Sequence, residues 1–326
     1  MKKLISLLLA LTMAATFTAC QSAAPAGEFS FNGTVTLLCD ADPGTNEDLL
    51  CRQIASSCQE VSGVTFVVEN VNGGNSATAV QTLKSSKDTD RNMYILLESN
   101  SMALSMLQGT NPYKIEDIQI VSKIASDWNV VVTTKDSGFE TWDDVVAYAK
   151  EHPGELNWGG AGAMNATQLG FSLYCLDAGI EANYVSYQGT GNAKVGLVSG
   201  DVQVLNGTSA NFLDNLREEN TEYVPLLTTK PENDFEGVDF VTCAELGYEN
   251  ANDYSSSRAI YVGSETSAEQ VKWLNDILAK AVETDSFNEF AKTNNIIKDF
   301  RATQEALEWF NDYVEMATEM IPKMAG

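Results

Sequence analysis

Histidine and basic side chains are scarce in this sequence. One His occurs in 326 residues, and 20 Lys and Arg stand against 45 Asp and Glu, so the formal net charge is −25. A surface this acidic repels nucleic acid and anionic lipid, and neither is expected as a partner. The single histidine, His152, precedes Pro153 at a predicted helix end, where we expect it to cap the helix or to face solvent.

Several enzyme motifs are missing as well. There is no GxSxG nucleophile elbow, and residues 159–165 lack the Lys and the Ser or Thr of a phosphate-binding P-loop. GGAGAM is not a dinucleotide-binding fingerprint with an acidic residue at the right distance. No Cys/His spacing indicates a metal site. The sequence therefore predicts no enzyme, no cofactor and no metal.

The five cysteines that follow Cys20 are odd in number, so at least one lacks an intramolecular partner. They are Cys39, Cys51, Cys58, Cys175 and Cys243. We expect them to be buried free thiols that pack as small apolar side chains, without a disulfide.

The N-terminal segment has the order of a secretory leader. MKK is followed by the apolar run Leu4–Ala15 and by Phe17-Thr18-Ala19-Cys20. This pattern predicts a lipoprotein signal peptide over residues 1–19, lipidation of Cys20 and a small-residue tether over residues 20–27. The apolar run is short for a membrane span of about 20 residues. We expect an extracytoplasmic protein, lipid-anchored to the cell membrane on its periplasmic side or at the cell surface.

The segment from Pro153 to Leu205 is a predicted βαβαβ unit. Short extended pieces precede two Gly-rich turns, and each turn leads into a helix. Leu169, Leu173 and Leu176 share one face of the first helix, which we expect to be buried. Such a unit forms a parallel sheet, and both turns lie at its carboxyl edge, where helix N-termini attract anions.

Residues 34–97 follow the same plan, with polar turns at residues 41–46 and 72–76. Two such units predict two α/β lobes that face each other across a cleft. We expect lobe 1 to be residues 28–127 with 229–326, and lobe 2 to be residues 128–228. The apolar runs Ile118–Ala125 and Asn129–Thr134 are separated by Ser126-Asp127-Trp128, where we expect the chain to cross between the lobes at a hinge near residues 126–129. A second hinge is expected near residues 227–230.

The candidate ligand residues lie in these turns. Asp48 starts a helix, where its carboxylate can cap N–H groups and shape the turn. Trp128 and Tyr187 are either core aromatics or walls of the cleft. Neither Gly-rich turn of residues 153–205 offers Lys or Arg, so an anion would be held by backbone N–H groups and neutral side chains.

Five motifs, in order along the chain, resemble those of the solute receptors of tripartite tricarboxylate transporters, the Bug-type binding proteins. The family's PGGGTDxxAR resembles residues 43–52, and its VVENRPGAGG resembles residues 67–75. NPGKLNYGSAGVGS resembles residues 152–165, VPYKGGGPALTDLLAGQVDV resembles residues 185–204, and VPTVAEAG resembles residues 240–247.

This resemblance implies a class II periplasmic-binding-protein fold, two α/β lobes with a ligand cleft between them. It also implies a ligand of the di- or tricarboxylate class, permease subunits of a tripartite transporter as partners, and a monomer. The implied substrate-binding residues are Pro43, Gly44, Thr45, Asn46, Asp48, Trp128, Gly160, Ala161, Gly162, Ala163, Met164, Asn165, Tyr187, Gly189 and Thr190.

This chain departs from the family motifs at several of these positions. Thr45, Asn46 and Glu47 replace Gly-Gly-Thr, and Met164 replaces a glycine. Side chains in place of glycines are expected to narrow or re-aim the pocket. Two alternatives stay open: a receptor for an uncharged solute, and a sensory lipoprotein that presents its ligand to a receptor kinase.

Overall fold

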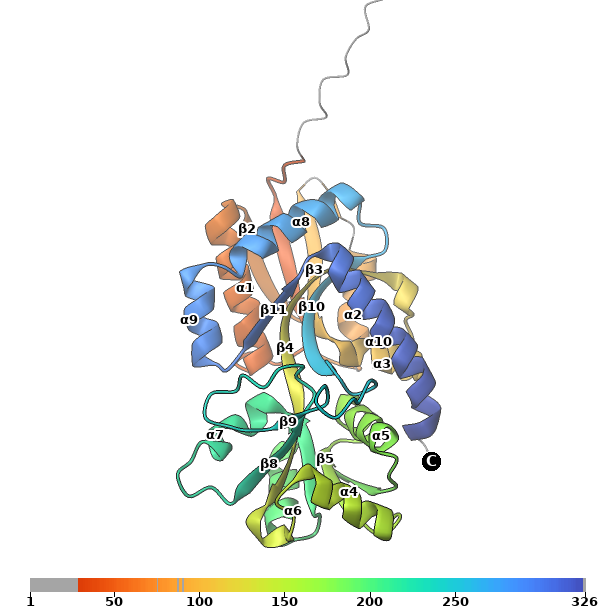
Figure 1. Cartoon of the computed structure of the whole chain (residues 1–326). Coiled ribbons are helices and arrows are strands. Elements are labelled where there is room, and N and C mark those ends of the chain that lie inside the picture. The colour runs from red at the N-terminus through yellow and green to blue at the C-terminus, as the bar shows by residue number, and fades with distance from the viewer. Residues whose placement is uncertain (1–28, 75, 87, 90, 325–326) are drawn as a thin grey trace, which may run out of the picture. The chain divides into compact units, whose positions relative to one another are not determined.

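Two sets of strands and helices, joined by one long strand, make up the part of the chain that the computed structural model describes (Figure 1). The described residues are 29–324, except 75, 87 and 90. The chain divides into the compact units Met1–Ser30 and Phe31–Gly326, and everything below concerns the second. The predicted leader, the tether and Cys20 lie outside the described residues.

The first set is the predicted βαβαβ unit with an added helix. Strand β1 pairs in parallel with β2 on one side and with β3 on the other. The elements are β1 (Thr34–Cys39), α1 (Asn46–Ser62), β2 (Thr65–Asn70), α2 (Ala77–Ser85), β3 (Asn92–Ser99) and α3 (Asn100–Leu107). Helix α3 was not predicted; its residues are almost all buried and show no polar face.

Strand β4 (Ile118–Thr134) joins the two sets. Ser126-Asp127-Trp128, where the crossing between lobes was expected, continues the same extended strand. Up to Trp128, β4 pairs with β10 (Ser255–Gly263) and β11 (Ile297–Arg301). From Asn129 onward it pairs with β7 (Val204–Thr208) and β8 (Tyr223–Thr228). One strand thus belongs to both halves of the sheet.

The second set contains the other predicted βαβαβ unit. Its strand β5 pairs in parallel with β6 and β7. The elements are α4 (Trp142–Glu151), β5 (Asn157–Ala161), α5 (Ala166–Ala178), β6 (Asn183–Tyr187), α6 (Thr190–Ser199) and β7. Thr141 and Asp144 form the predicted capping box of α4, and His152 is its C-cap as expected.

The chain then returns to the first set. Strand β8 pairs with β9 (Val241–Thr242), so the segment that follows β8 stays beside the second set until β10 begins at Ser255. The remaining elements are α7 (Leu213–Leu216), α8 (Ala268–Ala281), α9 (Asp285–Thr293) and α10 (Thr303–Met324), with single 3₁₀ turns at Ile115–Asp117, Lys135–Ser137 and Ser209–Asn211.

The hydrophobic core runs through both sets. Trp158 is fully buried and stacks on Tyr174 with ring centroids 5.9 Å apart, while Phe310 of α10 packs against Tyr261 of β10. Leu169 and Leu173 are buried as predicted, but the prediction for Leu176 is wrong, since it is 44% exposed. Leu176 instead lines an open pocket beside Met316 and Met320 of α10. The five cysteines in the described residues are free thiols.

Candidate functional site

The carboxyl ends of the parallel strands of both sets open onto two cavities. One is lined by Asn46 and Glu47 of α1 together with Thr208, which ends β7, and Ala210 and Asn211, which follow it. The other is lined by Ser76 and Ser101, which lie beyond β2 and β3, together with Ala163, Met164 and Asn165, which follow β5. Each cavity has a volume of about 260 Å³. We call them the Glu47 cavity and the Met164 cavity.

The predicted site residues divide between these cavities. Asn46 lines the Glu47 cavity, and Ala163, Met164 and Asn165 line the Met164 cavity. The remaining predicted residues line neither of the two, and they shape the turns or lie at the hinge.

Asp48 organises the turn between β1 and α1 without facing either cavity. Its buried carboxylate accepts hydrogen bonds from the Gly44 N–H, Arg52 Nε and Asn70 Nδ2, each at 2.9 Å. The bond from Arg52, with those from Gly44 and Asn70, holds the pKa of Asp48 well below its usual range. Thr45 caps α1 by accepting the Asp48 N–H, and Pro43 and Gly44 are exposed beside it. The carboxylate is therefore permanently charged and fixes the turn.

The Gly-rich turn after β5 is held by its neighbours. Asn165 caps α5 by accepting the Thr167 and Gln168 N–H groups, and it donates to the Ala161 carbonyl at 2.8 Å. Gly162 has φ of +79°, and a Cβ there would lie 2.4 Å from Asn165 Nδ2. Gly160 is equally constrained, because a Cβ would lie 2.2 Å from the Tyr184 hydroxyl. Glycine is thus required at both positions.

A contact across the cleft fixes the far end of this turn. Gln108, just after α3, donates from Nε2 to the Met164 carbonyl at 2.9 Å. Met164 itself has φ of +53° and is 36% exposed. The residue that replaces a family glycine therefore keeps a glycine-like backbone and presents its side chain at the cavity.

The third predicted turn stands beside the second. The Gly162 N–H donates to the Tyr187 carbonyl at 2.8 Å, and the Gly189 N–H donates to the same oxygen at 2.9 Å. Gly189 is the N-cap of α6 and Thr190 is its first residue. The ring of Tyr187 packs against Gly196, where a Cβ would lie 2.3 Å from the hydroxyl. Tyr187 is therefore a packing residue that also ties the two turns together through its backbone.

Arg258 is a cleft residue that sequence reasoning missed. It comes from β10 and lines the Glu47 cavity, where its Nε lies 3.0 Å from Glu47 Oε2. Burial works against its charge, but Glu47, Glu98 and Asp127 outweigh burial and raise the pKa of Arg258. The only signal in the sequence was an Arg next to an apolar strand. Glu47 points at this guanidinium.

A second missed group is Glu98 at the end of β3. Its carboxyl is 8% exposed and accepts hydrogen bonds from the Ser99 N–H at 2.7 Å and from Ser76 Oγ at 3.0 Å. Burial and the nearby Glu47 charge raise the pKa of Glu98 to about 8. Desolvation also raises the pKa of Asp40, at the carboxyl end of β1. Lobe 1 thus presents an acidic edge to the cleft.

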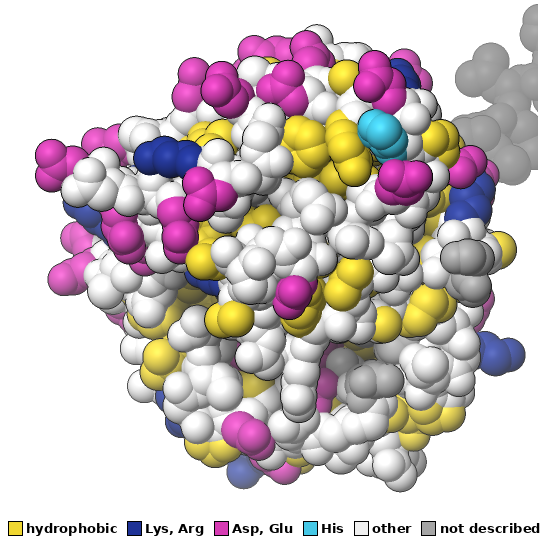
Figure 2. All heavy atoms as spheres, turned by 90° about the horizontal axis from the view of Figure 1, so that it is seen from below, with side chains coloured by type: hydrophobic (Ala, Val, Ile, Leu, Met, Phe, Trp, Pro, Cys, Tyr) yellow, Lys and Arg dark blue, Asp and Glu magenta, His cyan; other side chains and the backbone are white. Residues whose placement is uncertain are grey.

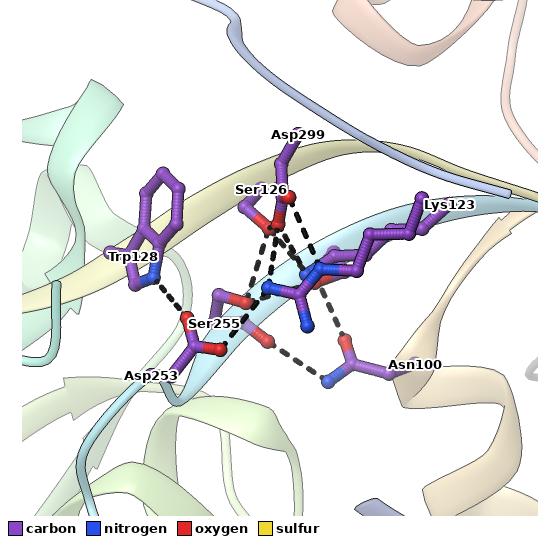
Figure 3. Close-up of polar contacts among 9 residues, drawn as sticks. Asn100, Lys123, Ser126, Trp128, Asp253, Ser255 and Asp299 are labelled. Atoms are coloured by element: carbon purple, nitrogen blue, oxygen red, sulfur yellow. Dashed lines mark hydrogen bonds and ion pairs between the residues drawn. The ribbon is translucent and has the colours of Figure 1, made fainter. Parts of the chain in front are cut away.

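Trp128 lies at the junction in β4, within a polar network (Figure 3). Its Nε1 donates to Asp253 Oδ1 at 3.0 Å, and Arg301 bridges Asp253 and Asp299. Ser126 donates to Asp299 Oδ2 at 2.7 Å. These contacts join β4 to Asp253, just before β10, and to Asp299 in β11, so Trp128 lies at the junction between the two sets and lines neither cavity.

The described residues contain no group of three or more His, Cys, Asp or Glu side chains arranged to hold a metal ion. Among them, no helix is both long and apolar enough to cross a bilayer. Figure 2 shows acidic side chains scattered over the face seen from below, with few basic ones among them. The groups that the two cavities offer a ligand are backbone N–H groups, hydroxyls, amides and the ion pair between Glu47 and Arg258.

Comparison with known sequences agrees with the family resemblance of the five motifs. The profile described as "Tripartite tricarboxylate transporter family receptor" matches residues 50–325. The chain is 31% identical over 215 residues to Protein BugT of Bordetella pertussis, a match over 63% of each chain. A second relative from the same organism is 26% identical over 52% of this chain and 53% of its own length. The chain thus spans only about half to 63% of the length of the curated relatives it matches.

Solved structures share the fold over most of the chain. A TctC solute binding protein from Polaromonas without ligand has a TM-score of 0.78 at 18% identity, covering 89% of this chain and 98% of its own. An R. palustris protein with adipate has a TM-score of 0.68 at 22% identity, and the match covers 90% of this chain and 97% of that protein. MatC from Rhodopseudomonas palustris with bound malate has a TM-score of 0.66 at 16% identity, covering 88% and 98%. The predicted two-lobe fold of periplasmic solute-binding proteins is confirmed.

Proposed function

Because this chain belongs to the tripartite tricarboxylate transporter receptor family, we propose that it captures a small organic acid outside the cytoplasmic membrane. It delivers that ligand to the permease subunits of a tripartite transporter and performs no covalent chemistry. The di- or tricarboxylate class is the starting hypothesis, since two proteins of the same fold carry adipate and malate.

The observation that carries this proposal is that both cavities of the cleft lie at the starts of helices, the Glu47 cavity at α1 and the Met164 cavity at α5. Helices α1 and α5 begin at the carboxyl edges of the two parallel units, each capped by a short polar side chain, Thr45 or Asn165. A helix N-terminus stabilises an anion by about 0.3–1 kcal/mol when exposed and up to ~2 kcal/mol when partly buried. One such end, together with several amide hydrogen bonds of about 1 kcal/mol each, supplies much of the roughly 8 kcal/mol that micromolar binding requires.

Binding is proposed to close the two lobes about the junction in β4. The hinge near residues 126–129 coincides with the point where β4 changes partners. Residues 229–254 are proposed to move with lobe 2, although we expected them in lobe 1, because β9 pairs with β8. The second crossing then lies just before Ser255, beside Asp253 of the hinge network.

A thermal-shift screen of the protein released from its leader tests the function. The ligands are di- and tricarboxylates, aromatic acids and neutral solutes. A ligand that binds only the folded state raises stability by about 2.7 kcal/mol at a hundredfold excess over Kd. A shift with a carboxylate supports the proposal, while a shift only with a neutral solute shows that the substituted glycines have rebuilt the pocket.

The lipid anchor is a separate proposal with its own test. Wild-type protein expressed with its leader should partition into detergent and carry acyl chains at Cys20 by mass spectrometry. The C20A variant should lose both while keeping the same ligand affinity. Equal partitioning of the two proteins would rule out lipidation at this residue.

A further inference from the structure

The ion pair between Glu47 and Arg258 leaves part of each side chain unused. Glu47 Oε2 accepts from Arg258 Nε at 3.0 Å, and Nη1 donates to Ser256 Oγ at 3.3 Å. The second carboxylate oxygen, Glu47 Oε1, is buried and has no hydrogen-bond partner among the described residues. The Arg258 side chain is 29% exposed, and the hydrogen bonds it makes among the described residues come from Nε and Nη1. An ion pair that served packing alone would be expected to satisfy the buried Glu47 oxygen.

Both side chains line the Glu47 cavity. Its volume of about 260 Å³ lies just below the usual range of small-molecule pockets, so it suits a ligand or ligand head of a few heavy atoms. The rest of its lining combines Leu50, Ile296 and Ile297 with amides and hydroxyls from both sets, among them Asn46, Thr208 and Asn211. Such a wall accepts a small polar group with a short apolar stem.

Carboxyl groups outnumber the single guanidinium around this cavity. Asp127 also lines it, and Glu98 acts on Arg258 from the end of β3. A ligand whose charges are all negative would meet one cation and several carboxyl groups. A ligand with one positive and one negative group would meet a partner for each.

We propose that the Glu47 cavity binds the head of a zwitterionic amino acid, with its ammonium group on Glu47 and its carboxylate on Arg258. This inference rests on the proposed function and narrows the ligand from organic acids in general to acids that carry an amino group. Glu47 is the specificity-determining residue. It stands where the resembling family motif has Thr, so the preference is a feature of this chain.

Matched ligand pairs test the inference by isothermal titration calorimetry. Aspartate and succinate, glutamate and glutarate, and alanine and propionate differ only in the amino group. For at least one pair the wild-type protein should bind the amino acid about tenfold or more tightly, as expected for a hydrogen bond to a charged partner. The inference would be overturned if, in every pair, the wild-type protein bound the acid without the amino group at least as tightly as the amino acid. The proposed function would still stand in that case.

Two substitutions at Glu47 assign the preference to its carboxylate. E47T introduces the family residue and E47Q keeps the shape, and both should abolish the preference for the amino acid. R258Q should weaken both members of a pair, and E269Q on the exposed start of α8 should change neither. An unchanged preference in folded E47T or E47Q would place the ammonium elsewhere and refute the assignment. Absence of binding by any acid, aminated or not, would instead refute the proposed function.

Discussion

Lys123 Nζ lies 2.6 Å from Asp299 Oδ2, with the Lys123 side chain completely buried in the middle of β4 (Figure 3). The same ammonium lies 4.6 Å from the centre of the Trp309 ring. Burial lowers the pKa of Lys123. Burial alone would raise the pKa of Asp299, but Lys123, Ser126 and Arg301 outweigh it and lower that pKa to about 2. The pair joins β4 to β11 immediately before the strand enters the second set.

Removing Lys123 should destabilise the protein strongly. K123M leaves the Asp299 carboxylate half-enclosed with only Arg301 as a cationic partner, and breaking a buried pair costs about 3–5 kcal/mol. Urea unfolding followed by circular dichroism measures the change. The control is K272M, whose ammonium is exposed and pairs with Asp276, and which should change stability by less than about 1 kcal/mol. Equal costs for the two variants would contradict a central role for the pair.

Glu98 should make the protein less stable as pH rises from about 4.5 to 8. Its pKa is about 8 in the folded state and near 4.5 when unfolded, so between these values the folded state holds a proton that the unfolded state has released. The free energy of unfolding then falls with pH, by at most about 1.4 kcal/mol per pH unit for this group, and levels off above pH 8. E98Q should flatten this dependence in unfolding titrations across the range. An unchanged slope would mean that Glu98 is ionised in the folded protein.

Enlarging Gly162 should abolish ligand binding. In G162L the new Cβ meets Asn165 Nδ2 at 2.4 Å and takes a backbone with φ of +79°, so the turn must move. Loss of the Asn165 cap costs about 1 kcal/mol, which leaves the fold intact. The control G200A also places a side chain at positive φ, but into open space. We expect calorimetry to detect no binding by G162L and near-normal affinity for G200A; normal affinity for G162L would place the ligand away from this turn.

Cutting the contact across the cleft should weaken binding without much effect on stability. Q108A removes the hydrogen bond to the Met164 carbonyl, which is worth about 0.5–1.5 kcal/mol. If that bond favours the closed state, ligand affinity should fall about two- to tenfold. Q304A removes a Gln that bonds only within α10, to Glu308, and should leave affinity unchanged. Identical affinities for Q108A and wild type would show that the bond does not contribute to closure.

Local patterns were enough to predict the two parallel units. The N-caps Thr141, Asn165 and Ser267 act over three residues, and each begins a helix. Gly179 and Gly200 end helices in the left-handed conformation for the same local reason. Where neighbouring residues decide the structure, the sequence was sufficient.

Elsewhere the structure depends on contacts between residues far apart in the sequence, and the prediction missed these. Ser126-Asp127-Trp128 looks like a polar break, yet it stays in β4 because its side chains bond to Asp299, Ser209 and Asp253. Arg258 and Glu98 are single charged residues on strands that were recognised by their apolar neighbours. Their roles depend on which strand ends meet at the cleft, and no local pattern records that.

The continuity of β4 also constrains how the chain folds. Residues 118–134 hydrogen-bond to strands that begin as late as Ser255 and Ile297. During synthesis, therefore, the middle of the sheet cannot be completed until nearly the whole chain has emerged. Because such distant pairings impose a large loop-closure entropy before they stabilise anything, we expect slow folding in one late, cooperative step. A chain whose central strand receives its last partners so late remains open for most of its synthesis.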